Sequence, residues 1–262
     1  MGTKLKILIT GANGYVARSL YKALHTKYDI TTITRQDFDL TNSQATNSWF
    51  EGKYFDVVIH TAADGGSRLK QDEQNVLDNN LRMFYNLVDS EHCFGRLISF
   101  GSGAEIYATD KPYGFSKKVI ADAVRLKENY YNLRIYAVFD KNELDTRFIK
   151  ANLLRYINRE DIVIHQNKHM DFFYMEDLVS LVKYYITAPD PVKEMDCCYD
   201  RSMTLVEIAK IINNLSDYQV GISVATELLS PRYTGTYRGL IIPLTGLEQG
   251  IKSTYNTLKC NQ

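Results

Sequence analysis

The sequence has no excess of charge of either sign, no long apolar run and no cluster of cysteine or histidine. Its 31 Lys and Arg residues balance 31 Asp and Glu residues, which argues against nucleic acid or an anionic membrane surface as the main partner. No stretch approaches the roughly 18 apolar residues of a membrane span. The apolar stretch from Leu5 to Ile9 is short and contains Lys6, so we expect no signal peptide.

Cysteine is scarce, and its spacing is uninformative. The four cysteines form no CxxC pair, and the five histidines show no HExxH spacing. This favours free thiols in a reducing compartment over disulfides or a zinc site. We therefore expect a cytoplasmic protein without a metal. What is present is 45% apolar residues, which is enough for a folded core.

Strand and helix signals alternate through the first half of the chain. Apolar runs predict buried strands over residues 4–10, 29–34, 56–60, 96–100 and 133–138. Apolar residues at helical spacing predict helices over residues 15–27, 73–89 and 113–129. Strands that alternate with helices need crossover connections, so we expect an α/β fold with a doubly wound, mostly parallel sheet covered on both faces.

The alternation loosens after residue 140. Helices are predicted over 147–159, 175–187 and 246–259, and a strand over 218–224. Thr204 and Glu207 form a capping-box pattern, which predicts a helix that runs to Asn214. No clean linker separates the halves. We expect a dinucleotide-binding body over residues 1–140 and a mainly substrate-binding α/β lobe over residues 141–262, interleaved because the helix at 175–187 returns to the body.

A glycine loop joins the first strand to the first helix, from Thr10 to Ala17. Gly11 permits a tight turn, Gly14 lets the backbone approach a pyrophosphate, and Ala17 allows close packing of helix on strand. The helix N-terminus offers free N–H groups and a partial positive charge to phosphate. The alternative is a purely structural turn, but the strand–loop–helix context favours a Rossmann-type dinucleotide site. Its expected contacts also include Asn13, Tyr15 and Val16.

Cofactor choice is read near the end of the second strand. Arg35 stands there, and a guanidinium pairs with the 2′-phosphate of NADP and stacks on adenine. In the alternative, Arg35 is a solvated surface residue and Asp37 binds the ribose of NAD. We expect NADP, with NAD as the alternative. Asp39 and Leu40 are expected at the adenine edge, and the small residues Thr61, Ala62 and Ala63 are expected where a cofactor crosses the strand ends.

The sequence contains three Tyr-xxx-Lys pairs, of which one has a suitable context. Tyr113 directly follows Pro112, which suits the first turn of a helix, and Lys117 is one turn further on. A neighbouring ammonium lowers the pKa of a phenol, so that Tyr113 can exchange a proton as hydride moves between nicotinamide and a carbinol carbon. We expect Lys117 to hold the nicotinamide ribose and Ser102, at a strand end, to steady the substrate oxygen. The alternative is a surface pair at chance spacing.

Taken together, these segments resemble the extended short-chain dehydrogenase/reductase family, in its NAD-dependent epimerase/dehydratase group. The resemblance rests on the glycine loop, on His60-Thr-Ala-Ala63, on Asn80, on Gly101-Ser102 and on Tyr113-Gly-x-Ser-Lys117. The segments Arg147-Phe-Ile149 and Asp171–Asp177 resemble motifs of the substrate lobe, and Arg35 is closest to the nucleotide-sugar 4-ketoreductase branch. The resemblance implies a cofactor contact at Asn80 and a homodimer packed through the helices at 73–89 and 113–129.

The chain departs from the family pattern in three places. The usual catalytic Ser or Thr is Gly103, so either the strand end is shifted by one residue, to Ser102, or the hydroxyl is lost. Ala104-Glu105 keeps only the Glu of a dehydratase pair, which argues against dehydration, and we expect Glu105 at the substrate. Met170 replaces an Arg that contacts the diphosphate. The remaining candidate cations, each alternatively a solvated surface residue, are Arg147, Arg232 and Arg238.

The sequence is therefore interpreted as an NADPH-dependent reductase of a 4-keto-6-deoxy nucleotide sugar, an oxidoreductase of deoxysugar biosynthesis. Hydride would pass to the keto carbon and Tyr113 would donate the proton. One alternative is an NAD-dependent nucleotide-sugar C4 epimerase. Another is a catalytically inactive NADP-binding protein on the same fold.

Overall fold

The computed structural model describes residues 3–67, 71–226, 230–239 and 242–260. The chain forms two compact units. The first consists of Met1–Arg134 and Lys183–Met195, and the second of Ile135–Val182 and Asp196–Gln262. The division into a binding body and a substrate lobe at residue 140 concerns function and stays a prediction.

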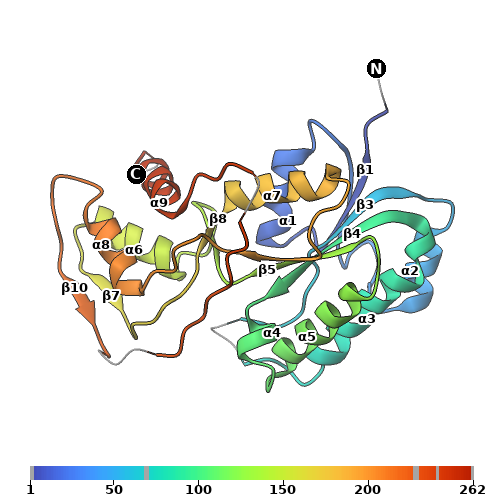
Figure 1. The fold of residues 1–262 in the computed structure, drawn as a ribbon, viewed down its shortest axis with the longest axis horizontal. Coiled ribbons are helices and arrows are strands. Elements are labelled where there is room, and N and C mark those ends of the chain that lie inside the picture. The colour runs from blue at the N-terminus through green and yellow to red at the C-terminus, as the bar shows by residue number, and fades with distance from the viewer. Residues whose placement is uncertain (1–2, 68–70, 227–229, 240–241, 261–262) are drawn as a thin grey trace. The chain divides into compact units, whose positions relative to one another are not determined.

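A six-stranded sheet organises the first unit, in the order β2-β1-β3-β4-β5-β9 (Figure 1). Its strands are β1 Lys6–Thr10, β2 Asp29–Ile33, β3 Phe55–His60, β4 Phe94–Ser102, β5 Tyr130–Ile135 and β9 Glu194–Cys197. The pairs β1–β2, β1–β3 and β3–β4 are parallel. Leu8, Val58 and Ile59 are fully buried, as expected for strands covered on both faces. The predicted doubly wound sheet is confirmed.

Helices lie on both faces of this sheet. They are α1 Tyr15–Leu24, α2 Ser43–Phe50, α3 Val76–Asp89, α4 Ala104–Tyr107 and α5 Pro112–Arg125. Figure 1 shows α2, α3 and α5 side by side on one face and α1 on the other. The sequence prediction missed α2 and α4. It also placed the fifth strand at 133–138, three residues too late, because Tyr130 and Tyr131 were not recognised as the buried start of β5.

The second unit has its own apolar core, in which buried side chains of three helices meet. The helices are α6 Phe148–Ile157, α8 Leu205–Asn213 and α9 Leu247–Lys259. The strands are β6 Val138–Phe139, β7 Ile162–Ile164, β8 Phe173–Tyr174 and β10 Ile222–Val224, paired as β10–β7 and β6–β8. The prediction missed β6, β7, β8 and β9, and only the end of the strand predicted at 218–224 is extended.

Two helices of the second half follow the sequence closely. The capping box at the start of α8 is present, because Thr204 Oγ1 accepts from the backbone N–H of Glu207 and the Glu207 carboxylate accepts from that of Thr204. Helix α7 Met175–Thr187 has the predicted bounds, and its residues are divided between the two units. Among the described residues, no helix is long and apolar enough to cross a membrane.

Candidate active site

A cavity of about 340 Å³ opens at the ends of β1, β2 and β3 in the first unit. It is lined by Thr10, Gly11, Gly14, Ile33, Thr34, Arg35, Phe38, Asp39, Leu40, Thr61, Ala62, Ala63, Asp64 and Met83. The structure thus brings together most of the residues predicted to bind a cofactor. Asn13, Tyr15 and Val16 lie beside Gly14, in the turn and the first turn of α1, but outside this lining.

The glycine loop has the geometry that its residues predict. Gly11 has φ +64°, and a Cβ there would stand 2.7 Å from the Cα atom of Ala62, so no other residue fits between the ends of β1 and β3. Gly14 is the N-cap of α1, and no side chain caps the helix there. The first N–H groups of α1 are therefore left to an anion.

The ends of β1 and β3 are joined by side chains of Thr10 and Thr61. Thr61 Oγ1 donates to the Thr10 carbonyl at 2.6 Å, and the Ala62 N–H donates to Thr10 Oγ1 at 3.2 Å. Thr10 Oγ1 also forms a hydrogen bond with His60 Nδ1 at 2.9 Å. Burial, with a smaller contribution from the charge of Lys117, lowers the pKa of His60 to about 3. The imidazole is therefore neutral, and it supports the rim of the cavity.

In the turn after β2, two acidic side chains near Arg35 in the chain bond to threonines of the turn. Asp37 Oδ2 accepts from the N–H and hydroxyl of Thr34 at 2.7 and 2.9 Å, and the backbone bond in particular lowers the pKa of Asp37. Asp39 Oδ1 similarly accepts from Thr41. Arg35 is exposed, and its side chain forms no hydrogen bond or ion pair within the described ranges.

Tyr113 and Lys117 lie in the first two turns of α5, which begins at Pro112. Lys117 is 6% exposed, and its Nζ donates to the Phe100 carbonyl at 2.8 Å and lies 5.8 Å from the centre of the Tyr113 ring. Burial lowers the pKa of Lys117 to about 8, and the negative charge of Glu105 opposes this shift. Lys117 is thus a buried cation at the base of the tyrosine ring at neutral pH.

Gly66 packs against the tyrosine, a contact that sequence reasoning missed. It has φ +72°, and a Cβ at this position would stand 2.6 Å from Cζ of Tyr113. Its N–H donates to Asp72 Oδ1 at 2.8 Å. The Gly65-Gly66 pair after β3 was the available signal, since adjacent glycines mark a backbone in an unusual conformation.

Ser102 is the last residue of β4, and Gly103 follows the strand. The Ser102 Oγ accepts from the Ala104 N–H at 3.2 Å, and the Ser102 N–H donates to Glu105 Oε2 at 3.3 Å. A hydroxyl is therefore present where the strand ends, one residue before the position usual in the family that the sequence resembles. A hydroxyl can donate its one proton and also accept, and here the oxygen accepts from Ala104.

Asn80 connects three segments around the tyrosine. Its Oδ1 accepts from the Asp64 N–H at 2.7 Å, and its Nδ2 donates to Ser116 Oγ at 3.0 Å. Ser116 Oγ in turn donates to the Tyr113 carbonyl at 2.7 Å. Asn80 therefore ties α3 to the loop after β3 and to the start of α5.

The residues predicted to bind substrate are divided between the two units. Glu105 is buried in the first unit, where it forms an ion pair with Arg134. The other three belong to the second unit and are exposed: Arg147, Arg232 and Arg238. Arg147 is the N-cap of α6, and Arg232 Nε donates to Thr234 Oγ1 at 2.8 Å. Met170 is 2% exposed in the core of the second unit, so that position serves packing here.

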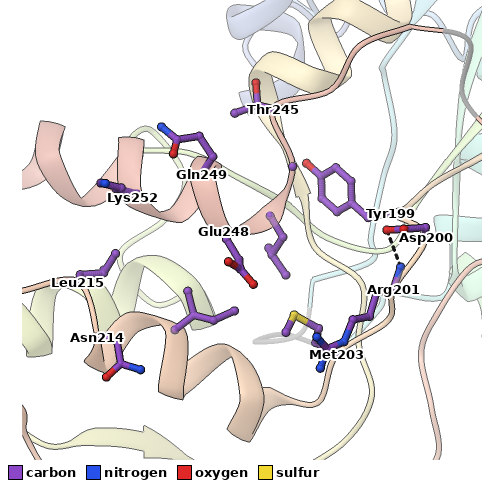
Figure 2. Close-up of a pocket in the computed structure, with 13 residues that line it drawn as sticks. Tyr199, Asp200, Arg201, Met203, Asn214, Leu215, Thr245, Glu248, Gln249 and Lys252 are labelled. Carbon is purple, nitrogen blue, oxygen red and sulfur yellow. Dashed lines mark hydrogen bonds between the residues drawn. The ribbon is translucent and has the colours of Figure 1, made fainter.

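A second cavity, of about 790 Å³, lies in the second unit beside α8 and α9 (Figure 2). It is lined by Tyr199, Asp200, Arg201, Met203, Ile211, Asn214, Leu215, Thr245, Gly246, Leu247, Glu248, Gln249 and Lys252. Tyr199 donates to the buried Asp177 at 2.5 Å, and Arg201 pairs with Glu207 at 2.9 Å. None of the residues predicted for the active site lines this cavity.

Known proteins resemble this chain in sequence and in fold. The family model described as "NAD dependent epimerase/dehydratase family" matches residues 7–197. A CDP-abequose synthase from Yersinia pseudotuberculosis is 21% identical over 285 aligned residues, which cover 95% of this chain and 99% of that protein.

Solved structures share the whole fold. A GDP-mannoheptose C4 reductase from Campylobacter jejuni, solved with NADP bound, superposes with a TM-score of 0.77 at 19% identity, over 99% of both chains. A dTDP-4-dehydrorhamnose reductase from Bacillus anthracis, in complex with NADP, superposes with a TM-score of 0.78 at 19% identity, over 98% of this chain and 99% of the other.

Proposed function

The chain belongs to the NAD dependent epimerase/dehydratase family, and on this premise we propose that it is an NADPH-dependent reductase of a 4-keto-6-deoxy nucleotide sugar. The observation that carries the proposal is the buried Lys117 one helical turn after Tyr113, in the same unit as the glycine-loop cavity. The two reductases named above are a GDP-mannoheptose C4 reductase and a dTDP-4-dehydrorhamnose reductase, and this similarity supports a nucleotide sugar as the substrate class.

The cavity suits a dinucleotide carrying a 2′-phosphate. The missing Cβ of Gly11 and the uncapped N-terminus of α1 leave room and donors for a pyrophosphate. Arg35 lines this cavity, and one oxygen of Asp37, the acid that would bind the ribose of NAD, is already bonded twice to Thr34. This supports NADP over NAD. Asp39, Leu40 and Thr61–Ala63, which line the same cavity, would contact the rest of the bound cofactor. When bound, NADPH supplies the hydride.

In this mechanism, side chains of the protein protonate the oxygen of the keto group and form hydrogen bonds with it. Tyr113 Oη donates the proton that turns the reduced carbonyl into a hydroxyl. Lys117, as a cation beneath the ring, stabilises the phenolate that remains. In this proposal the hydroxyl of Ser102 donates its proton to the same oxygen, while one of its lone pairs accepts from the Ala104 N–H. The neutral His60 adds no charge, so Lys117 supplies the positive potential.

We further propose that Arg147, Arg232 and Arg238 contact the diphosphate of the substrate. They are exposed cations of the second unit, and a guanidinium binds phosphate through two parallel hydrogen bonds. The homodimer through α3 and α5 and the cytoplasmic location remain part of the proposal.

The test is a substrate panel combined with one substitution. Purified protein is assayed against 4-keto-6-deoxy nucleotide sugars with NADPH and NADH. Tyr113→Phe is expected to reduce turnover by about 100-fold or more while NADPH binding persists. Tyr107→Phe is the matched control, because Tyr107 belongs to another Tyr-xxx-Lys pair and is 41% exposed; it is expected to keep full activity.

An unchanged rate for Tyr113→Phe would contradict the mechanism. Protein that purifies with bound NAD and interconverts C4 epimers without net consumption would instead indicate the epimerase. NADP binding without turnover of any panel member would indicate an inactive relative.

A further inference from the structure

Glu105 is buried and paired inside the first unit, whereas a residue that binds substrate would be expected to be exposed. The Glu105 side chain is 2% exposed, and its Oε1 forms an ion pair with Arg134 and accepts from Asn132 Nδ2 at 3.2 Å. Its other oxygen accepts from the Ser102 N–H at 3.3 Å. The carboxylate is therefore anchored from β5 and directed at the end of β4.

The backbone of β4 leaves room for this carboxylate. A Cβ at Gly101 would stand 2.7 Å from Glu105 Oε2 and 2.5 Å from Asn132 Oδ1. Any larger residue at 101 would displace Glu105 from the strand end. Gly101 therefore allows a buried negative charge to approach Phe100 and Ser102, the residues on either side of it in the chain.

The same strand end holds the ammonium of Lys117, through the Phe100 carbonyl. Three other titratable groups surround the site: Glu105 from α4, His60 from β3 and Tyr113 from α5 itself. His60 is neutral, and Arg134 on β5 faces Glu105 and Glu194. Glu105 therefore supplies the negative charge that opposes the desolvation of Lys117, whose pKa falls to about 8 on burial.

We propose that Glu105 is a positioning residue, which holds Lys117 in its cationic form and fixes the Ser102 backbone while it remains anchored by Arg134 and Asn132. The proposal rests on the proposed function, because it assigns Glu105 to the proton chemistry of that site. It replaces the expectation that Glu105 binds substrate. The segment Gly101–Glu105 then contains both the hydroxyl of Ser102 and the carboxylate of Glu105 that stabilises the charge of Lys117.

The test measures Lys117 directly, without turnover. The side-chain carbons of lysine are labelled with ¹³C, and the Lys117 signal is assigned by its loss in Lys117→Arg. Its titration is followed by NMR in the wild type and in Glu105→Gln, which keeps the shape but removes the charge. We expect the pKa of Lys117 to fall by about one pH unit or more in Glu105→Gln.

The matched control is Glu194→Gln. Glu194 is the other acidic partner of Arg134, at 2.9 Å, but its side chain is 18% exposed, and it is Glu105 whose charge raises the pKa of Lys117. We expect the titration of Lys117 to stay as in the wild type. Since Glu105→Gln leaves Arg134 with one carboxylate, the double variant Glu105→Gln/Arg134→Gln is measured too, and the same fall is expected.

Kinetics provide the second readout. In Glu105→Gln, the decline of kcat/KM for the keto sugar at high pH should begin at a lower pH than in the wild type. Activity should partly recover when the pH is lowered, because Lys117 is then protonated. A purely structural role of Glu105 would not produce this pH dependence. An unchanged Lys117 titration in Glu105→Gln and in the double variant overturns the proposal, and so does an equal shift in Glu194→Gln. A wild type that reduces no keto sugar contradicts the proposed function, while the lysine titration still decides the role of Glu105.

Discussion

At the scale of single residues, the proposed preference for NADPH depends on the exposed side chain of Arg35. Arg35 lines the glycine-loop cavity beside Thr34 and Asp39, and Asp37 is turned back on Thr34. The two acids nearest to Arg35 in the chain thus have an oxygen engaged by a threonine, Asp37 by Thr34 and Asp39 by Thr41. An interaction with a 2′-phosphate discriminates NADPH from NADH, because only the first carries that group.

We expect Arg35→Gln to raise KM for NADPH about tenfold or more and to leave KM for NADH unchanged, since one charge-assisted phosphate contact is lost. Steady-state kinetics with both cofactors measure this. Lys22→Gln removes another exposed cation, on α1, and serves as the control. An equal loss with NADH would argue against the contact with the 2′-phosphate.

His60 couples the stability of the fold to pH. The pKa of His60 is about 3 in the folded protein, compared with 6.5 for the imidazole in the unfolded chain. As pH falls below 6.5 the unfolded chain takes up a proton that the folded protein refuses, so the free energy of unfolding decreases towards pH 3. Urea unfolding at several pH values should show this slope. In His60→Gln that part of the slope should disappear, and an unaltered slope would mean that other groups cause it.

At the scale of elements, the contact between α4 and α5 brings the site together. Helix α5 carries Tyr113 and Lys117, and α4 carries Glu105. The two helices approach so closely at Gly114 that a Cβ there would stand 2.0 Å from the Ala108 carbonyl oxygen. The small residue next to the tyrosine therefore sets the separation between both helices.

Gly114→Ala is expected to destabilise the protein by about 1–3 kcal/mol, because the helices must move apart. Turnover should fall further than stability alone explains, since the tyrosine and the buried carboxylate are displaced together. Thermal unfolding and kcat/KM measure the two effects. Lys118→Ala, at an exposed position of the same helix, should change neither, and a fully stable Gly114→Ala protein would refute the tight contact.

At the scale of the whole molecule, the chain passes between its two units three times, after Arg134, Val182 and Met195. In the second unit, the buried carboxylate of Asp177 holds the segment that leads into α9. Asp177 accepts from the N–H groups of Thr245 and Gly246 at 2.7 and 3.0 Å, besides the Tyr199 hydroxyl. The segment before α9 is thus connected to α7 by polar bonds, while Ile251 and Tyr255 of α9 belong to the apolar core with α6 and α8.

Asp177→Ala should lower the free energy of unfolding by about 3 kcal/mol, because several charge-assisted bonds are lost inside the protein. Urea denaturation measures the loss, and hydrogen exchange should show that the amides of Thr245 and Gly246 lose protection. The exposed Glu248, on the first turn of α9, is the control, and Glu248→Ala should be nearly neutral. Retained protection at both amides would contradict this attachment.

Local rules account for the features that the sequence by itself determined. A left-handed backbone at Gly11, apolar runs in buried strands, the start of α5 at Pro112 and the capping box of α8 each depend on residues close in the chain. The family expected from such motifs is confirmed over residues 7–197. The short elements α2, α4, β7 and β8 escaped prediction, because their few residues carry too little periodicity to signal a helix or strand.

Contacts between distant residues decided the rest. Glu105 carries a sequence signal of a substrate ligand, yet Arg134 and Asn132 on β5 draw it into the interior. Gly66 gives no sign of the ring that it meets, because Tyr113 lies on another element. Whether a charged side chain faces solvent or a buried partner depends on desolvation and pairing in three dimensions, and no local pattern encodes that balance. The sequence by itself determined that Tyr113 and Lys117 stand one turn apart at the start of a helix, and only the tertiary structure decided which charges surround them.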